Sequence, residues 1–315
     1  MAEHILAPMA ELSHRALREL IESFFDRPDT PRPEYYSEMI SAAGLLSGGP
    51  FEKWYLDGGP RQERLVYQLL GSDPEKLAAA AGVLDTLPCL GIDINMGCAA
   101  PAITRTGAGV RLMEDIDKAG RIAAALRKAT KKRLSVKMRL GSRPPPGSDD
   151  LPGFERLLTF CRRLENEGVE FIALHPRLAG EKFKRRARWD YVEALRKELS
   201  IPVAGNGDIG SAAGLADRAK AGPAMIGRLA VKEPWVFAAA PRQSTARLEE
   251  TAFRFLDLLS LHQPPEFHLS RARRFFRYYC DNFTWAEYLR NKINREESLG
   301  GIGRVIHEYC RENPR

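Results

Sequence analysis

The sequence predicts an α/β chain, a (β/α)8 barrel followed by an all-α helical bundle. Eight short runs rich in apolar and β-branched residues alternate with segments whose apolar residues recur at helical spacing. The runs are apolar almost throughout, as in parallel strands that are covered on both faces. All eight fall within about the first 240 residues, the usual size of such a barrel. In chain order, the predicted strands are Ile5–Met9, Tyr35–Ile40, Leu65–Leu70, Ile92–Met96, Leu134–Leu140, Phe171–His175, Ile201–Asn206 and Ala224–Gly227.

The segments between the predicted strands carry apolar residues at helical spacing, for example within 16–21, 77–84 and 122–126. An open, doubly wound parallel sheet is the alternative architecture for alternating strands and helices. That fold would place a glycine-rich dinucleotide-binding fingerprint after an early strand, and the sequence has none there. We therefore expect the strands to close into a TIM barrel.

The composition changes after residues 241–244, where the strand patterns stop and only helical patterns continue. Pro264 and Pro265 separate the first two of these patterns, because proline disrupts a helix interior. We expect a barrel domain over residues 1–242 and a helical domain over residues 243–315. The predicted helices of the second domain span about 246–262, 269–281, 284–297 and 301–311.

The chain has 315 residues, a net charge of +7 and five cysteines. No apolar run approaches the roughly 20 residues that a membrane-spanning helix needs, and the N-terminus lacks the pattern of a signal peptide. The cysteines form no C-x-x-C pair, and no histidine stands at metal-ligand spacing. We expect a cytoplasmic monomer without disulfides, a metal site or membrane contact. The basic charge suits a polyanionic partner such as nucleic acid.

Polar side chains that donate hydrogen bonds or carry charge stand at the C-terminal ends of most predicted strands. These ends converge on one mouth of a parallel barrel, where such enzymes keep their chemistry. Buried strands have no structural need for these groups, and burying them without partners would be unfavourable. A ligand in the barrel mouth explains them. The residues are Gln68, Asn95, Cys98, Lys137, Arg139, His175, Arg177, Asn206, Asp208 and Arg228.

The last two predicted strands end in Gly207 and Gly227, which allow a ligand to approach the backbone closely. Arg228 follows, and a guanidinium group can bind phosphate through two hydrogen bonds. The loops after strands seven and eight are the usual phosphate site of this fold. The alternative is that residues 206–208 form only a turn, as Asn-Gly often does. The match of both loops together favours phosphate.

Short motifs in a characteristic order identify a resemblance to a known family. The chain resembles the tRNA-dihydrouridine synthases, flavin enzymes that reduce uridine in RNA. The motifs are Leu6-Ala7-Pro8-Met9, Ser37-Glu38-Met39, Val66-Tyr67-Gln68-Leu69, Asn95-Met96-Gly97-Cys98, Gly107-Ala108-Gly109, Val136-Lys137-Met138-Arg139-Leu140-Gly141, Leu174-His175-Pro176-Arg177, Trp189-Asp190, Ile201-Pro202-Val203 through Asn206-Gly207-Asp208-Ile209, and Met225-Ile226-Gly227-Arg228.

The resemblance implies flavin mononucleotide (FMN) in the barrel mouth, NADPH as the reductant and tRNA as the substrate. Pro8 and Met9 would pack by the flavin ring, and Lys137 by its polar edge, where a cation favours the anionic reduced flavin. The strand-seven and strand-eight loops would hold the phosphate. The implied cofactor-binding residues are Pro8, Met9, Ala10, Gln68, Lys137, His175, Asn206, Gly207, Asp208, Gly227 and Arg228.

Cys98 is the predicted catalytic residue. Reduction of uridine places a hydride on C6, which reduced flavin would supply, and then a proton on C5. A free thiol keeps its proton at neutral pH, so Cys98 can serve as the acid. The alternative is a small buried hydrophobe, the usual fate of a free cysteine.

Two arginine- and lysine-rich stretches are predicted to contact RNA phosphates, one after the sixth strand and one in the helical domain. In the second stretch the interleaved aromatic residues have helical spacing, so we expect them in the core and the arginines on the outer face. The alternative for the first stretch is a solvated charged loop, and the alternative for the aromatic residues of the second is a set of base-stacking platforms. The predicted substrate and RNA contacts are Asn95, Arg139, Arg177, Lys182, Lys184, Arg185, Arg186, Arg188, Arg271 and Arg274.

The sequence departs from the family pattern at Ala99, where proline is usual, and at Ala10-Glu11 in the first loop. Its helical domain resembles the family only loosely. Two other functions stay open: a flavin reductase of a free pyrimidine or another small molecule, and a non-catalytic RNA-binding barrel. The presence of Cys98, Lys137 and His175 together argues against the second. Ribosomal RNA as substrate, NADH as reductant and the position of the uridine also stay open.

Overall fold

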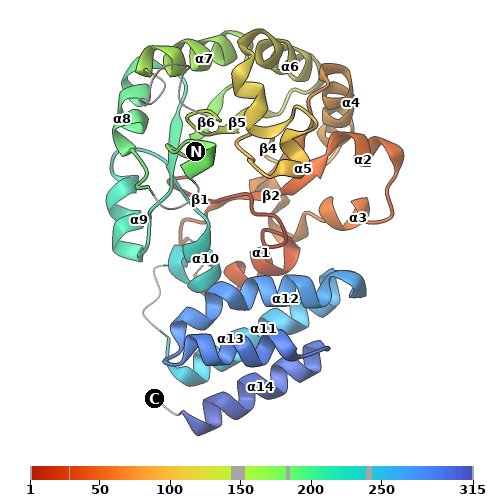
Figure 1. Ribbon diagram of the computed structural model, residues 1–315, viewed down its shortest axis with the longest axis vertical. Helices are drawn as coiled ribbons and strands as arrows, with labels where there is room; N and C mark the ends of the chain where they lie inside the picture. The colour runs from red at the N-terminus through yellow and green to blue at the C-terminus, as the bar shows by residue number, and fades with distance from the viewer. Residues whose placement is uncertain (1, 28, 143–152, 182–184, 239–242, 314–315) are drawn as a thin grey trace.

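The computed structural model describes residues 2–27, 29–142, 153–181, 185–238 and 243–313. Eight parallel strands, β1 to β8, close into a barrel in chain order, with β1 beside β8 (Figure 1). The prediction of a closed (β/α)8 barrel is therefore confirmed, and the open sheet is wrong. The strands are β1 His4–Leu6, β2 Glu34–Ser41, β3 Leu65–Leu70, β4 Gly91–Met96, β5 Arg133–Met138, β6 Phe171–Leu174, β7 Val203–Asn206 and β8 Ala224–Ile226.

Helices follow the strands and cover the outside of the barrel (Figure 1). Local sequence explains several of their starts: Asp73 accepts hydrogen bonds from the backbone N–H groups of Glu75 and Lys76, and Pro74 occupies the first turn. The α-helices of this part are α1 Arg15–Glu22, α2 Ala42–Ser47, α3 Glu52–Tyr55, α4 Pro74–Asp85, α5 Pro101–Thr104, α6 Ile116–Ala129, α7 Phe154–Asn166, α8 Trp189–Glu198, α9 Ala212–Ala219 and α10 Arg228–Lys232. The 3₁₀ helices are η1 Gly59–Arg64, η2 Gly109–Glu114, η3 Ala179–Glu181 and η4 Val236–Ala238.

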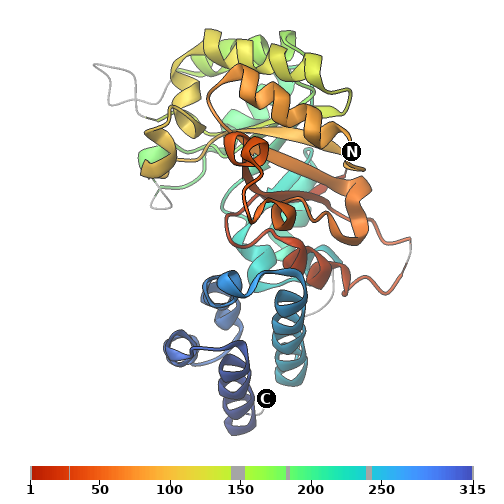
Figure 2. The same ribbon diagram turned by 90° about the vertical axis from the view of Figure 1, so that its right-hand side faces the viewer.

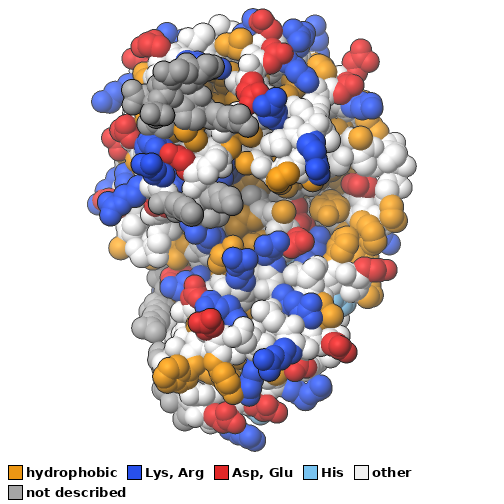
Figure 3. Space-filling model, viewed as in Figure 1, with side chains coloured by type: hydrophobic (Ala, Val, Ile, Leu, Met, Phe, Trp, Pro, Cys, Tyr) orange, Lys and Arg blue, Asp and Glu red, His pale blue; other side chains and the backbone are white. Residues whose placement is uncertain are grey.

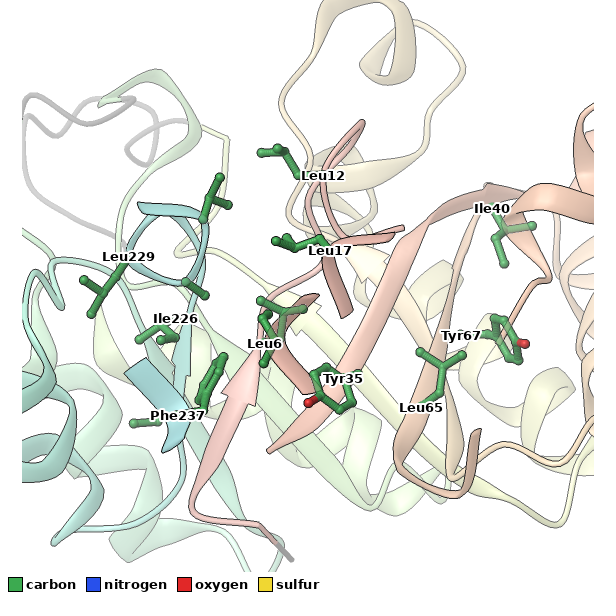
Figure 4. Close-up of a cluster of buried hydrophobic side chains, with 14 of the residues drawn as sticks. Leu6, Leu12, Leu17, Tyr35, Ile40, Leu65, Tyr67, Ile226, Leu229 and Phe237 are labelled. Carbon is green, nitrogen blue, oxygen red and sulfur yellow. The ribbon is translucent and has the colours of Figure 1, made fainter. Parts of the chain in front are cut away.

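Two layers of apolar side chains stabilise the barrel. Figure 4 shows part of the outer layer, in which Leu6, Leu17 and Tyr35 belong to one buried cluster between strands and helices. A smaller cluster, which includes Tyr36 and Phe171, is formed by alternate strand residues. This alternation follows from the two-residue period of a strand, which sends successive side chains to opposite faces.

The C-terminal part of the chain is helical and lies at one side of the barrel (Figures 1 and 2). Its longest helix packs against α1, and the next helix packs against α10. The four helices are α11 Thr245–His262, α12 Pro265–Tyr279, α13 Ala286–Arg295 and α14 Leu299–Glu312, and η5 Cys280–Asn282 joins two of them. The prediction placed the start of α12 four residues late, because Pro265 begins this helix at its first turn, where proline is favoured.

Aromatic residues form the core of the helical part, as expected. Phe275 stacks on Phe255 with ring centroids 3.7 Å apart, and Phe276 and Tyr279 are also buried. The expectation that the arginines lie on the outer face is wrong for Arg271, which is only 2% exposed. The predicted boundary at residues 242 and 243 falls beside 239–242, which lie outside the described residues, so the division into two domains stays a prediction.

None of the helices in the described part of the chain is long and apolar enough to cross a membrane. The same residues contain no group of three or more potential metal ligands. All five cysteines are free thiols, and four of them are buried.

Candidate active site

A cavity of about 160 Å³ opens at the C-terminal ends of the strands. Most of the predicted cofactor residues meet there, although they come from distant parts of the chain. Those that line the cavity are Pro8, Met9, Lys137, His175, Asn206, Gly207, Asp208, Gly227 and Arg228, together with Arg139. The strand-end pattern therefore predicted a real assembly of side chains.

Positive charge dominates this cavity. Burial, together with the charges of Lys137, Arg139, Arg177 and Arg228, lowers the pKa of His175 to about 2. His175 is therefore neutral at physiological pH. Burial and the charge of Arg139 lower the pKa of Lys137 to about 8, so this ammonium group is close to losing its proton. A cavity with this field favours an anionic ligand.

Arg139 is held with one face toward the turn that contains Cys98. Its Nε donates a hydrogen bond of 3.0 Å to the carbonyl of Gly97. Its Nη1 is buried and has no hydrogen-bond partner among the described residues. Because an unpaired buried guanidinium nitrogen is unfavourable, this atom is available to an acceptor on a ligand.

Two glycines, at the ends of β7 and β8, lie at one side of the cavity. Gly207 has φ +117°, and a Cβ there would meet the His175 ring at 2.9 Å. A Cβ on Gly227 would come within 3.0 Å of the Met9 sulfur. The positive φ at Gly207 is unfavourable for other residues, and a side chain at Gly227 would require the Met9 sulfur to move.

A buried chain of polar side chains lies beneath the Cys98 turn. Gln68 donates from Nε2 to Asp93 at 2.7 Å, and Asn95 donates from Nδ2 to Gln68 at 2.8 Å. The Asn95 Oδ1 in turn accepts the backbone N–H of Cys98 at 2.9 Å. Ser135 also donates to Asp93, at 2.6 Å. Burial raises the pKa of Asp93 to about 6.

Cys98 stands at the end of this chain. Its own carbonyl accepts the N–H of Val110 at 2.9 Å, so both sides of the peptide are fixed. It is the only one of the five cysteines that is not buried, and the described chain contains all five. The alternative of a small buried hydrophobe is therefore wrong. The Cys98 thiol also lies close enough to Lys137 and Arg139 to act on their pKa values.

Three predicted residues lie differently from expectation. Gln68 was expected to contact the cofactor and Asn95 the substrate, but the two are 0% and 6% exposed and bond to each other. Asn95 binds the backbone of the turn that presents Cys98, and Gln68 holds the Asn95 side chain. Ala10 is exposed and is not part of the cavity wall.

Arg177 was expected to contact RNA, and its position contradicts that expectation. It is 2% exposed, and its Nη2 binds Asp208 at 2.5 and 2.7 Å. Its Nη1 lies 3.0 Å from the Nε2 of His175, and its Nε donates to the carbonyl of Arg185. The side chain is used within the protein, where it positions His175 and Asp208.

The basic segment after β6 is only partly described. Lys182 and Lys184 lie outside the described residues, while Arg185 and Arg186 are exposed beside the barrel mouth. Arg188 pairs with Glu181 at 2.6 Å, which neutralises it. The predicted cationic run begins at residue 182 and contains no acid. The acidic partner of Arg188, Glu181, lies one residue before the run, so the prediction did not include the pairing.

A second cavity, of about 870 Å³, lies between the first barrel loop and helices α12 and α13. We call it the arginine groove. Figure 3 shows Lys and Arg side chains on this face where α12 meets the barrel. The prediction of an RNA contact is consistent with the place of Arg274 and not with that of Arg271, which is buried. The groove lining contains Arg273, Arg274, Arg277 and Arg290 together with the acids Glu11, Asp281 and Glu287. Arg274 pairs with Glu11 and Arg290 with Asp281, so Arg273 and Arg277 contribute most of the positive charge.

Sequence reasoning missed Asp93, Glu38 and Glu11. Asp93 and Asn95 alternate with isoleucines in a buried strand, and this two-residue spacing places both polar groups on one face. That spacing was a usable signal. No local signal marks Glu38, because its partner Arg271 is 233 residues away in the chain.

Comparison with known proteins shows the family of the chain. The family model described as dihydrouridine synthase matches residues 5–301. A probable tRNA-dihydrouridine synthase of Aquifex aeolicus is 32% identical over 245 residues, covering 75% of this chain and 71% of the relative. The tRNA-dihydrouridine(16) synthase of Cupriavidus necator is 32% identical over 246 residues, with 75% and 72% covered. The tRNA-dihydrouridine synthase B of Pseudomonas aeruginosa is 27% identical, with 98% and 92% covered. The chain therefore belongs to the dihydrouridine synthase family.

Proposed function

We propose that this protein reduces uridine to 5,6-dihydrouridine in tRNA, with FMN bound in the barrel mouth, NADPH as the reductant and Cys98 as the proton donor. The observation that supports this most directly is that Lys137, Arg139 and His175 line the cavity of a barrel of this family, with the Cys98 thiol close enough to Lys137 and Arg139 to act on their pKa values.

The residues around the smaller cavity suit FMN. Its phosphate is an anion, and the cavity has an excess of cations, among them Arg228 beside Gly227. The unpaired Nη1 of Arg139 and the ammonium of Lys137 are donors for carbonyl oxygens of the ring or of the base. Neutral His175 adds a hydrogen-bonding group without further charge. When bound, reduced flavin supplies the hydride for C6 of uracil.

The protein chain supplies the proton donor and holds it in place. Hydride addition at C6 leaves negative charge that is relieved by protonation at C5, and the Cys98 thiol is the nearest candidate acid on the turn after β4. Asn95 fixes this turn through the Cys98 and Gly97 N–H groups, at 2.9 and 3.2 Å. Cationic Lys137 and Arg139 stabilise the thiolate that remains after the transfer.

The arginine groove and the exposed Arg185 and Arg186 would hold the RNA backbone. The groove lies between the first barrel loop and the helical part, and Arg185 and Arg186 are exposed in the loop after β6. A uridine must leave its stack before it can enter a barrel, and phosphate contacts on either side would hold the strand during that step. Neither feature is needed for a free pyrimidine, so RNA is the better substrate.

Two measurements test the proposal. Purified protein should release FMN on denaturation, and Arg228→Ala should weaken FMN binding by roughly ten- to hundredfold, because a charged hydrogen bond contributes about 1.5–3 kcal/mol. Arg304→Ala, an exposed residue of α14, is the matched control. Dihydrouridine should then be mapped in tRNA and ribosomal RNA after incubation with NADPH. Protein that binds no flavin, or that leaves tRNA unchanged, would refute the proposal.

A further inference from the structure

A buried ion pair joins the helical part to the barrel next to the first loop. Arg271 of α12 donates from Nη1 to Oε2 of Glu38 at 2.7 Å, and the two residues are 2% and 5% exposed. The guanidinium also lies over the Phe267 ring, 4.8 Å from its centroid. A charge pair this deeply buried is sensitive to the loss of either partner, because the remaining charge cannot be solvated.

The position of Glu38 results from an irregularity in β2. Residues 37 and 38 lie between the register pairs Tyr36–Val66 and Met39–Gln68, so two residues face one on β3. Such bulges redirect side chains and are common beside active sites. Here the bulge turns Glu38 toward the first loop and toward α12.

The second oxygen of Glu38 holds the backbone of the first loop. Its Oε1 accepts the N–H of Glu11 at 2.6 Å. Glu11 has φ +63°, a left-handed conformation that is unfavourable for residues other than glycine. Asp208 is the only other non-glycine residue with positive φ in the described chain. The Glu38 hydrogen bond therefore stabilises a strained peptide.

Glu11 lies between the two cavities. It lines the arginine groove, and its carboxylate accepts a hydrogen bond of 2.9 Å from Arg274, one turn after Arg271. Two residues earlier, Met9 lines the barrel mouth and packs against Gly227. The Ser13 hydroxyl closes the intervening turn by accepting the Met9 N–H at 2.9 Å. A change at Glu11 is therefore transmitted to Met9 through a short, hydrogen-bonded loop.

We infer that Arg271 and Glu38 are positioning residues for the cofactor site: helix α12 fixes Met9 through the Arg271–Glu38–Glu11 contacts and so links the arginine groove to the barrel mouth. This inference rests on the proposed function, since FMN is the ligand at the mouth. Linkage is reciprocal, so RNA bound along α12 and FMN bound beside Met9 strengthen each other when both require the same loop conformation.

The test compares two buried ion pairs at opposite ends of the barrel. Arg271→Gln removes the pair beside the loop, and Arg133→Gln removes the matched pair with Glu34, whose members are 14% and 4% exposed. For Arg271→Gln we expect the FMN dissociation constant, measured by quenching of flavin fluorescence, to rise about tenfold, within the roughly 5- to 150-fold range of such couplings. Arg133→Gln should lower the melting temperature and leave FMN affinity unchanged. Arg271→Lys should restore most of the affinity, because it keeps the charge.

Hydrogen exchange at the Glu11 amide gives a readout that does not need flavin. Exchange should accelerate at least about tenfold in Arg271→Gln, since the strained peptide loses its fixed acceptor, and should not change in Arg133→Gln. If wild-type protein binds no FMN, the proposed function fails, and this amide still reports whether Arg271 sets the loop. Unchanged FMN affinity and unchanged Glu11 exchange in Arg271→Gln and Arg271→Lys would overturn the inference and leave Arg271 a structural residue only.

Discussion

The two ends of the barrel differ in the pairing of their buried cations: the mouth holds Arg177 paired with Asp208, but also two cations that have no acidic partner among the described residues. At the N-terminal end, Arg133 pairs with Glu34 at 2.5 Å, and Arg32 pairs with Glu22 at 3.0 Å. At the mouth, neither Lys137 nor Arg139 has an acidic partner within 4.0 Å in the described part of the chain. Balanced charge stabilises the fold, whereas unbalanced buried charge is unfavourable until a ligand compensates it. The difference supports the proposal that the ligand binds at the mouth.

The largest expected effect is at Cys98. Cys98→Ala should reduce dihydrouridine formation by roughly 10²- to 10⁴-fold, the usual loss when a positioned acid is removed. Reduction of bound flavin by NADPH should stay normal, because that half-reaction does not involve uridine. Both rates should be measured separately by stopped-flow absorbance and by RNA analysis. Cys89→Ala, at the opposite end of β4, is the matched control; equal losses in both variants would assign Cys98 a structural role.

Removal of a balanced pair should affect stability alone. Arg133→Gln leaves Glu34 buried without its partner, so the free energy of unfolding should fall by about 3 kcal/mol. Urea unfolding followed by circular dichroism measures this change. FMN affinity should stay within twofold of the wild type. A large drop in FMN affinity with little loss of stability would contradict the proposal that the mouth binds the ligand and that the N-terminal ion pairs only stabilise the fold.

At the mouth, Lys137 predicts a pH dependence. Its lowered pKa of about 8 means that the ammonium loses its proton as the pH rises through 8. Because the charged form is the one that favours an anionic ligand, FMN affinity should fall above pH 8, by up to about tenfold per pH unit. Lys137→Met should bind FMN roughly ten- to hundredfold more weakly at pH 7 and show no such fall. Lys132→Met, at the N-terminal end, should keep the wild-type profile in the same fluorescence titration.

The smallest effect concerns exposed arginines near the mouth. Arg185→Ala combined with Arg186→Ala should reduce the slope of log affinity for tRNA against log salt by about one per lost phosphate contact. Lys128→Ala with Lys131→Ala removes the same charge from the other end and should leave the slope unchanged. Filter binding at several salt concentrations measures both. Equal slopes in the two double variants would show that Arg185 and Arg186 are solvated and make no phosphate contacts.

The sequence predicted the strands well because their apolar runs are continuous and their order follows the chain. β3 was predicted with its observed ends, and the other strands shifted by up to three residues. The cavity residues were predicted because the strand ends of a parallel barrel converge by geometry. The roles of Arg271 and Arg177 were not, since an arginine at a polar helical or loop position looks exposed until its distant partner is known. The bulge that directs Glu38 also depends on the register with β3, which the local pattern does not encode.

The pairing of β1 with β8 sets the order in which the site can be built. Ile5 lies opposite Met225, so closure of the barrel joins residues about 220 positions apart. At a synthesis rate of roughly 5–20 residues per second, β8 is synthesised about 10 to 45 s after β1. Met9 reaches Gly227 only after that closure, which makes the cofactor cavity one of the last features to form. Until β8 is made, the edge of β1 that will pair with it stays unpaired. We therefore expect conditions that slow barrel closure to produce protein that has formed its helices but lacks the cofactor cavity.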